Sequence, residues 1–160
     1  MTINLDNFLH SLALFMVAGV SGLVYATIPR GLWIGQAKEG ETAGVQNCAD
    51  PYSSLILFGG PVLIWSPLPR RAIQVKTTGI DHSLAMAQAQ KLYETLLDGG
   101  TGGYPLQMFQ IAGKTTAGAN DGHWRLVSVE LQQPPALIDV DERNRGIVVF
   151  NFEVGFFKEA

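Results

Sequence analysis

The chain offers few side chains that could act as a catalytic nucleophile. Its one cysteine is Cys48. Paired with His82 or His123, that thiol could attack a carbonyl carbon while the imidazole accepts its proton. A lone cysteine and a histidine can be paired by chance in most sequences, and this one has no G-x-S-x-G, H-E-x-x-H, P-loop or C-x-x-C motif. We therefore predict that the protein is not an enzyme, and interpret Cys48 as a small apolar residue or a loop thiol.

Two further patterns could bind a ligand, and each has a simpler structural explanation. Asp81 and His82 could hold a metal ion, but three histidines without clustered carboxylates form a poor ligand set. Asp81 is better suited to capping a helix that begins at His82. Gly59 and Gly60 could present backbone amides to an anion, but no G-x-G-x-x-G pattern or following helix supports this. With Pro61 they predict a structural turn, and we expect no metal and no cofactor.

The composition predicts a compact domain with little charge for its size. Of its 160 residues, 47% are hydrophobic and 16% are charged, against about 25% charged in a typical soluble domain. This length predicts one domain, residues 1–160, with a core that needs no metal or disulfide. The net charge of −3 argues against a general nucleic-acid binder, which concentrates Lys and Arg. The low charge suggests that some surface is buried against copies or partners.

The first 28 residues have two possible interpretations. Residues 8–28 contain no charged side chain and are long enough to span a bilayer, so a small membrane-anchored domain is one alternative. The other is an amphipathic helix within residues 1–18, because apolar residues recur there at helical spacing. These are Leu5, Phe8, Leu9, Leu12, Phe15 and Met16. Glycines at 19 and 22 would end that helix before a β-branched stretch at 24–27. We favour the packed helix and expect no membrane contact.

Hydrophobic periodicity along the rest of the chain predicts mostly strands. A second helix is expected over 82–98, with Ala85, Ala89, Leu92 and Leu96 on its apolar face and Thr95 on its polar face. Strands are expected at 55–58, 62–65, 71–78, 106–112, 123–133 and 146–157. Residues 32–50 are expected to form a loop, and 99–103 and 113–122 glycine-rich loops. The fold class is therefore α+β, a mostly antiparallel sheet with two main helices packed on one face.

A series of motifs in a fixed order carries the best functional indication. A cysteine-containing segment, NCADPYSSLILFGGP, leads into the Gly-Gly-Pro turn. The strand RAIQVKTTG and the alanine-rich helix DHSLAMAQAQKLYETLLD follow. The chain then has Q-P-P, the charged turn DVDERNRG and the closing strand VVFNFEV. Over residues 45–157 this order resembles the tail terminator family of long-tailed bacteriophages, often labelled minor capsid or minor tail proteins.

The resemblance implies a structural role in the virion. Such proteins form a hexameric ring that caps the tail tube, stops its polymerisation and joins the tail to the head or neck connector. The implied partners are copies of the chain itself, the tail tube protein and the head–tail connector protein. No sequence-specific nucleic acid is implied, although DNA would pass through the ring lumen. The implied location is the virion tail or neck, assembled in the host cytoplasm.

A ring requires an interface that closes on itself, and sheet edges can supply one. Prolines at 67, 69, 134 and 135 would limit runaway strand pairing, and the pair at 134 and 135 is expected to end its strand. Arginine–carboxylate pairs can fix the register of such an interface. We therefore expect the following residues at a subunit or partner interface: Arg70, Arg71, Asp141, Arg143 and Arg145.

Three alternative functions remain at this point. The protein could be another ring protein of the virion, either in the neck or in the tail tube. It could be the small domain anchored in a membrane by residues 8–28. It could also be a small hydrolase, although Cys48 is then its only candidate nucleophile.

Overall fold

The structure, a computed structural model, describes most of the chain. The described residues are 5–20, 24–25, 31–35, 51–58, 70–98, 109–142 and 144–159. Several predicted features lie outside them, namely Cys48, the turn at Gly59, Gly60 and Pro61, the strand at 62–65, the loop at 99–103 and Arg143.

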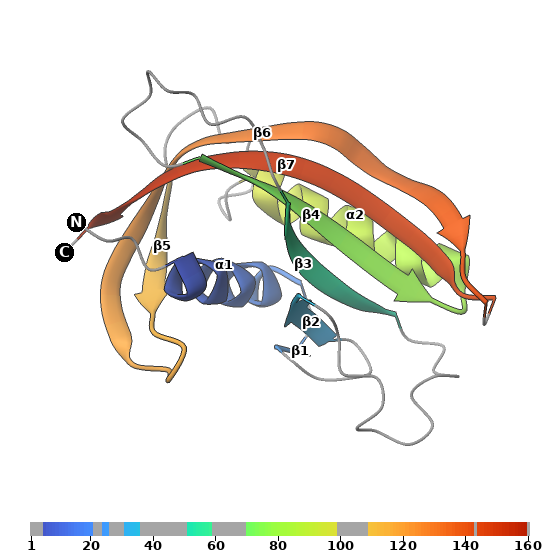
Figure 1. Ribbon diagram of the computed structural model, residues 1–160, viewed down its shortest axis with the longest axis horizontal. Coiled ribbons are helices and arrows are strands. Elements are labelled where there is room, and N and C mark those ends of the chain that lie inside the picture. The colour runs from blue at the N-terminus through green and yellow to red at the C-terminus, as the bar shows by residue number, and fades with distance from the viewer. Residues whose placement is uncertain are drawn as a thin grey trace.

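The described residues form one sheet of seven strands and two helices (Figure 1). In chain order the elements are α1 (Leu5–Ala18), β1 (Val24–Tyr25), β2 (Gly31–Ile34), β3 (Tyr52–Phe58), β4 (Arg70–Gly79), α2 (His82–Asp98), β5 (Phe109–Lys114), β6 (Asn120–Val140) and β7 (Gly146–Glu159). The strand order in the sheet is β1-β2-β3-β4-β7-β6-β5. The β1–β2 and β2–β3 pairs are parallel and the other four are antiparallel. The predicted α+β class with a mostly antiparallel sheet is confirmed.

Both helices pack on the same face of β7. Alternate residues of a regular strand share one face, and the even-numbered ones from Val148 to Phe156 are all at most 1% exposed. Tyr93 of α2 meets Phe150 edge-on, with ring centroids 5.6 Å apart. Phe8 of α1 stacks on Phe156, with centroids 3.7 Å apart. Figure 1 shows the sheet curling around this face.

Helix α1 lies between the two ends of the curled sheet. It packs against β5 on one side and against β1 and β2 on the other (Figure 1). Leu32 of β2 and Ile111 of β5 belong to the same core as Phe8 and Leu12. The expectation of a loop throughout 32–50 is therefore wrong at its start, where β2 forms because Leu32 supplies a fully buried side chain.

The structure confirms the amphipathic interpretation of the N-terminal region. Helix α1 ends at Ala18, and β1 lies within the span 8–28. Phe8, Leu12 and Met16 are fully buried in the protein core. Within the described part of the chain, neither helix combines the length and apolar character that crossing a bilayer requires.

Helix α2 has the bounds that the sequence predicts. Asp81 caps it, because its Oδ1 accepts hydrogen bonds from the backbone N–H groups of Ser83 (2.9 Å) and Leu84 (3.2 Å). The alanines and leucines of its predicted apolar face are all fully buried. Thr95 was expected on the polar face, but it is only 6% exposed. It is buried because the chain after α1 passes so close that a Cβ at Gly19 would lie 2.4 Å from Thr95 Cγ2.

The expected ends of two late strands are wrong. The glycine-rich loop at 113–122 is shorter than expected, because β5 continues to Lys114 and β6 starts at Asn120. A turn joins them, with Thr115 N–H donating to the carbonyl of Ala119. Strand β6 does not end at Pro134 and Pro135 but continues to Val140, because an irregular register accommodates both prolines.

Candidate subunit interface

Beyond the end of β5, strand β6 has a long edge to which none of the described strands pairs. β5 pairs with β6 only between Asn120 and Leu126, whereas β7 pairs with β6 as far as Val140. No strand in the described ranges pairs with the other side of β6 from Val127 to Val140. This part of β6 bounds the sheet in Figure 1. Such an edge carries backbone donors and acceptors that another chain could satisfy.

Two prolines interrupt this edge. Gln133 is opposite Asn151 and Ala136 is opposite Val149, so β6 takes three residue steps where β7 takes two. Successive N–H groups of a strand point to opposite sides, so one of two adjacent prolines would otherwise leave a missing donor toward β7. The bulge removes that position from the regular ladder. The prolines and the bulge together prevent the edge from pairing continuously with another strand.

Exposed apolar side chains accompany the end of this edge. Leu137, Ile138 and Val140 of β6 are 46%, 57% and 41% exposed, and Leu84 of α2 is 43% exposed. Leu137 also lines a shallow groove of about 500 Å³ against the first half of α2. Its other lining residues are His82, Ser83, Met86, Ala87 and Gln90. We call the surface formed by Leu137 and these lining residues the α2–β6 groove. Exposed apolar surface of this kind can mark a contact site.

The charged turn that follows β6 is organised by contacts within the chain. Arg145 is 8% exposed, and its Nε donates to Asp141 Oδ2 at 2.7 Å. Its backbone N–H donates to Asp141 Oδ1 at 2.9 Å, and its Nη1 donates to the hydroxyl of Tyr52 at 3.0 Å. Arg145 therefore ties the β6–β7 turn to the start of β3. An additional contact of Asp141 or Arg145 with a partner remains a prediction.

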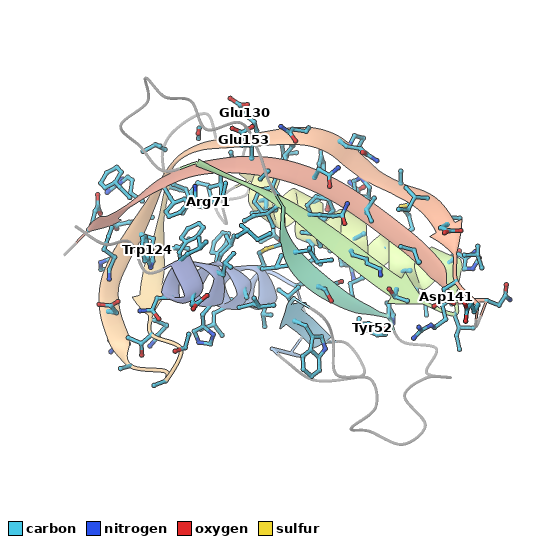
Figure 2. The ribbon with its side chains drawn as sticks, in the orientation of Figure 1. Tyr52, Arg71, Trp124, Glu130, Asp141 and Glu153 are labelled. Carbon is cyan, nitrogen blue, oxygen red and sulfur yellow. The ribbon has the colours of Figure 1, made fainter. Side chains whose placement is uncertain are left out.

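The predicted interface residues do not form one cluster. Arg71 is opposite Val154, whereas the turn that holds Asp141 and Arg145 precedes Gly146 at the other end of the β4–β7 pair. Figure 2 shows Arg71 and Asp141 at separate places along the sheet. Arg70 begins β4. The structure thus divides these residues between two regions.

Arg71 lies beside an exposed leucine. Residues 71 and 73 of β4 share one face, and Ile73, which is fully buried on the helix side, is opposite Leu57 of β3. Leu57 is 39% exposed, and Arg71 is also exposed. We call Leu57 and Arg71 the β3–β4 corner. Neither Leu57 nor the apolar end of β6 was predicted as a surface feature, because hydrophobic pattern alone does not distinguish a covered strand end from an open one.

The outer face of the sheet carries a ladder of polar side chains. Gln74 donates to Asn151 Oδ1 at 3.2 Å, and Asn151 donates to Gln133 Oε1 at 3.4 Å. Glu130 and Glu153 are directly opposite each other on β6 and β7 (Figure 2). The alternation of polar residues in β4 and β7 indicated this face. These side chains lie on the side of the sheet away from both helices, and Glu153 is buried there at 8% exposure.

The two histidines that were considered as possible catalytic bases, His82 and His123, lie far apart. His82 packs on Gly146 at the start of α2, where a Cβ at Gly146 would lie 2.6 Å from His82 Cδ2. His123 is opposite Glu159 at the other end of β6. Among residues that the structure describes, no group of three or more His, Cys, Asp or Glu side chains could hold a metal ion.

Comparison with known proteins does not assign the chain to a family. No protein-family model matches the chain, and no curated protein is significantly similar to it.

Proposed function

We propose that the protein is a structural virion protein that forms a ring and acts as the tail terminator of a long-tailed bacteriophage. The observation that carries this proposal is the edge of β6 from Val127 to Val140, to which no described strand pairs, with its exposed apolar end. A monomer that functions alone has no need of a 14-residue sheet edge beside an exposed apolar groove, whereas a ring subunit requires a contact surface of this kind.

The form of the edge favours a closed assembly over a fibre. An uninterrupted edge can pair with another strand along its whole length, which favours open-ended aggregates. Pro134, Pro135 and the adjacent bulge restrict that pairing in β6. Contacts between copies must then depend on specific side chains, and specific head-to-tail contacts close into a ring when the rotation between copies allows it.

The role of the ring follows from the resemblance of the sequence to tail terminators. One side of the ring would bind the last layer of the tail tube and stop further addition, and the other would bind the head or neck connector.

Particle mass and imaging test this proposal. Light scattering of the purified full chain should give a mass of six subunits of 17.3 kDa, and negative-stain images should show six-fold rings. A mass of one subunit at every concentration tested would overturn the ring.

The same images distinguish the alternative virion proteins. A tail-tube protein would polymerise into long tubes on its own, whereas a terminator stops at one ring. Adding the ring to a polymerising tube protein from the same phage should shorten the tubes, and a neck ring protein would not change their length.

A further inference from the structure

We propose that subunits join head to tail, with the β3–β4 corner of one copy seated in the α2–β6 groove of the next. This inference rests on the proposed ring and names the two surfaces that form it. The partner at each surface is a second copy of the same chain.

The two surfaces have the separation that a head-to-tail contact requires. In the sheet order, β3 and β6 are separated by β4 and β7. Along β7, the corner is level with Phe152 and Val154, and the groove is level with Gly146 and Val148. Two different patches at separate places on one subunit produce a heterologous contact, which forms a ring when it closes.

Both surfaces are apolar at their centre. Leu57 is 39% exposed at the corner, and Leu137 is 46% exposed beside Met86 in the groove. Both leucines lie on the helix side of the sheet, because their cross-strand neighbours Ile73 and Val148 are fully buried there. Packing Leu57 of one copy against Leu137 of the next would remove apolar surface of both copies from water, which favours association.

The charges around the two surfaces are complementary. Two exposed acidic residues lie near the end of the groove: Asp81 precedes the lining residue His82, and Glu142 is in the turn before Gly146, on which His82 packs. The corner carries the exposed basic residue Arg71. Arg145, the basic residue that the structure describes in the adjacent turn, is 8% exposed and bound to Asp141. Corner-to-groove docking therefore brings opposite charges together, while groove-to-groove docking would bring carboxylates together.

Two variants that each damage one surface provide a sharp test. Leu57→Glu alters the corner and leaves the groove intact, and Leu137→Glu does the reverse. Each variant alone should lose the ring and have the mass of one subunit. A 1:1 mixture should give dimers and nothing larger. The intact corner of the Leu137→Glu chain docks into the intact groove of the Leu57→Glu chain, and the two surfaces that remain in this dimer are both altered.

Controls separate docking from folding and from the ring proposal itself. Ala117→Glu, in the exposed turn between β5 and β6, should keep the ring. Thermal melts should be cooperative for every variant. Arg71→Glu and Ala87→Glu are second variants for the corner and the groove if either leucine variant fails to fold, because Ala87 is an exposed residue that lines the groove.

The outcomes are distinguishable. Rings that persist in both the corner and the groove variants overturn this inference and leave the ring proposal standing. Two monomeric variants that give no dimer on mixing also overturn it, because they indicate a symmetric contact. A wild-type chain that forms no ring overturns this inference and the proposed function together.

Discussion

Ser11 is a polar residue buried on a face of α1 that the hydrophobic stripe does not include. It is 1% exposed. Its hydroxyl accepts a hydrogen bond from the backbone N–H of Lys114 at 2.8 Å, and it can donate to the carbonyl of Asn7 at 2.7 Å. Asn7 also accepts from the backbone N–H of Thr116 at 3.2 Å. These polar contacts fasten the first helix to the β5–β6 hairpin.

Removing the hydroxyl of Ser11 should lower the stability of the fold. Ser11→Ala leaves the N–H of Lys114 without its acceptor in a part-buried position, so we expect the free energy of unfolding to fall by about 1–3 kcal/mol. Urea denaturation measures the change. Lys91→Ala, at an exposed position of α2 that does not line the α2–β6 groove, is the control and should change stability by less than about 0.5 kcal/mol. Equal losses in the two variants would contradict the structural role of Ser11.

The ion pair between Arg125 and Glu159 should make stability depend on acid pH. Arg125 Nε donates to Glu159 Oε1 at 2.7 Å. This bond, followed by one from Gln110, holds the pKa of Glu159 below its ordinary value. The folded state therefore binds this proton less readily than the unfolded state. The stabilisation is present above the unfolded pKa of about 4.3 and is lost as pH falls through the folded pKa.

The measurement compares the wild type with Glu159→Gln. The wild type should be the more stable at pH 7, and the difference should disappear toward pH 3. Urea denaturation midpoints at pH 7, 5 and 3 give this comparison. A difference that stays constant down to pH 3 would show that the carboxylate charge has no part in it.

At the scale of elements, the sequence predicts the bounds of a helix or strand correctly when residues of that same element set its ends. Helix α2 has a capping aspartate before it and a regular apolar face, and its predicted bounds match. The burial of Thr95 was not predictable, because it depends on the approach of Gly19 from another element. The length of β6 was missed because two prolines normally end a strand, and only pairing with β7 shows that a bulge absorbs them.

The proline pair should protect the free edge of β6 from aggregation. Replacing both, as Pro134→Thr with Pro135→Val, restores an N–H donor at each position, one of which can point to the free edge, and adds β-branched side chains. We expect faster aggregation with little loss of solubility at low concentration. Light scattering over time at raised concentration measures this rate. Gln132→Thr, an exposed position in the same strand, is the control and should aggregate like the wild type.

At the scale of the whole molecule, α1 completes the core. Phe8, Leu12 and Met16 are completely buried, and the exposed fraction of each is 0%. Burying three such side chains contributes about 5–8 kcal/mol before entropy is counted, which is comparable to the net stability of a small domain. The fold class and the packing of this helix were predictable from periodicity. The α2–β6 groove was not, because it depends on how two distant elements meet.

Deleting residues 1–18 should therefore prevent folding. We expect the shortened chain to be insoluble, or soluble without a cooperative thermal transition. Recovery after expression and circular dichroism on heating give the answer. A shortened chain that is soluble and melts cooperatively would show that α1 is an appendage and not part of the core.

The position of α1 also has a consequence for synthesis on the ribosome. Phe8 is made 148 residues before its stacking partner Phe156. At about 5–20 residues per second, the helix waits roughly 7–30 seconds for that partner. During this time its apolar side chains have no complete binding site in the nascent chain, so this segment is a natural target for chaperones that shield hydrophobic peptides. The core can close only after β7 has been translated.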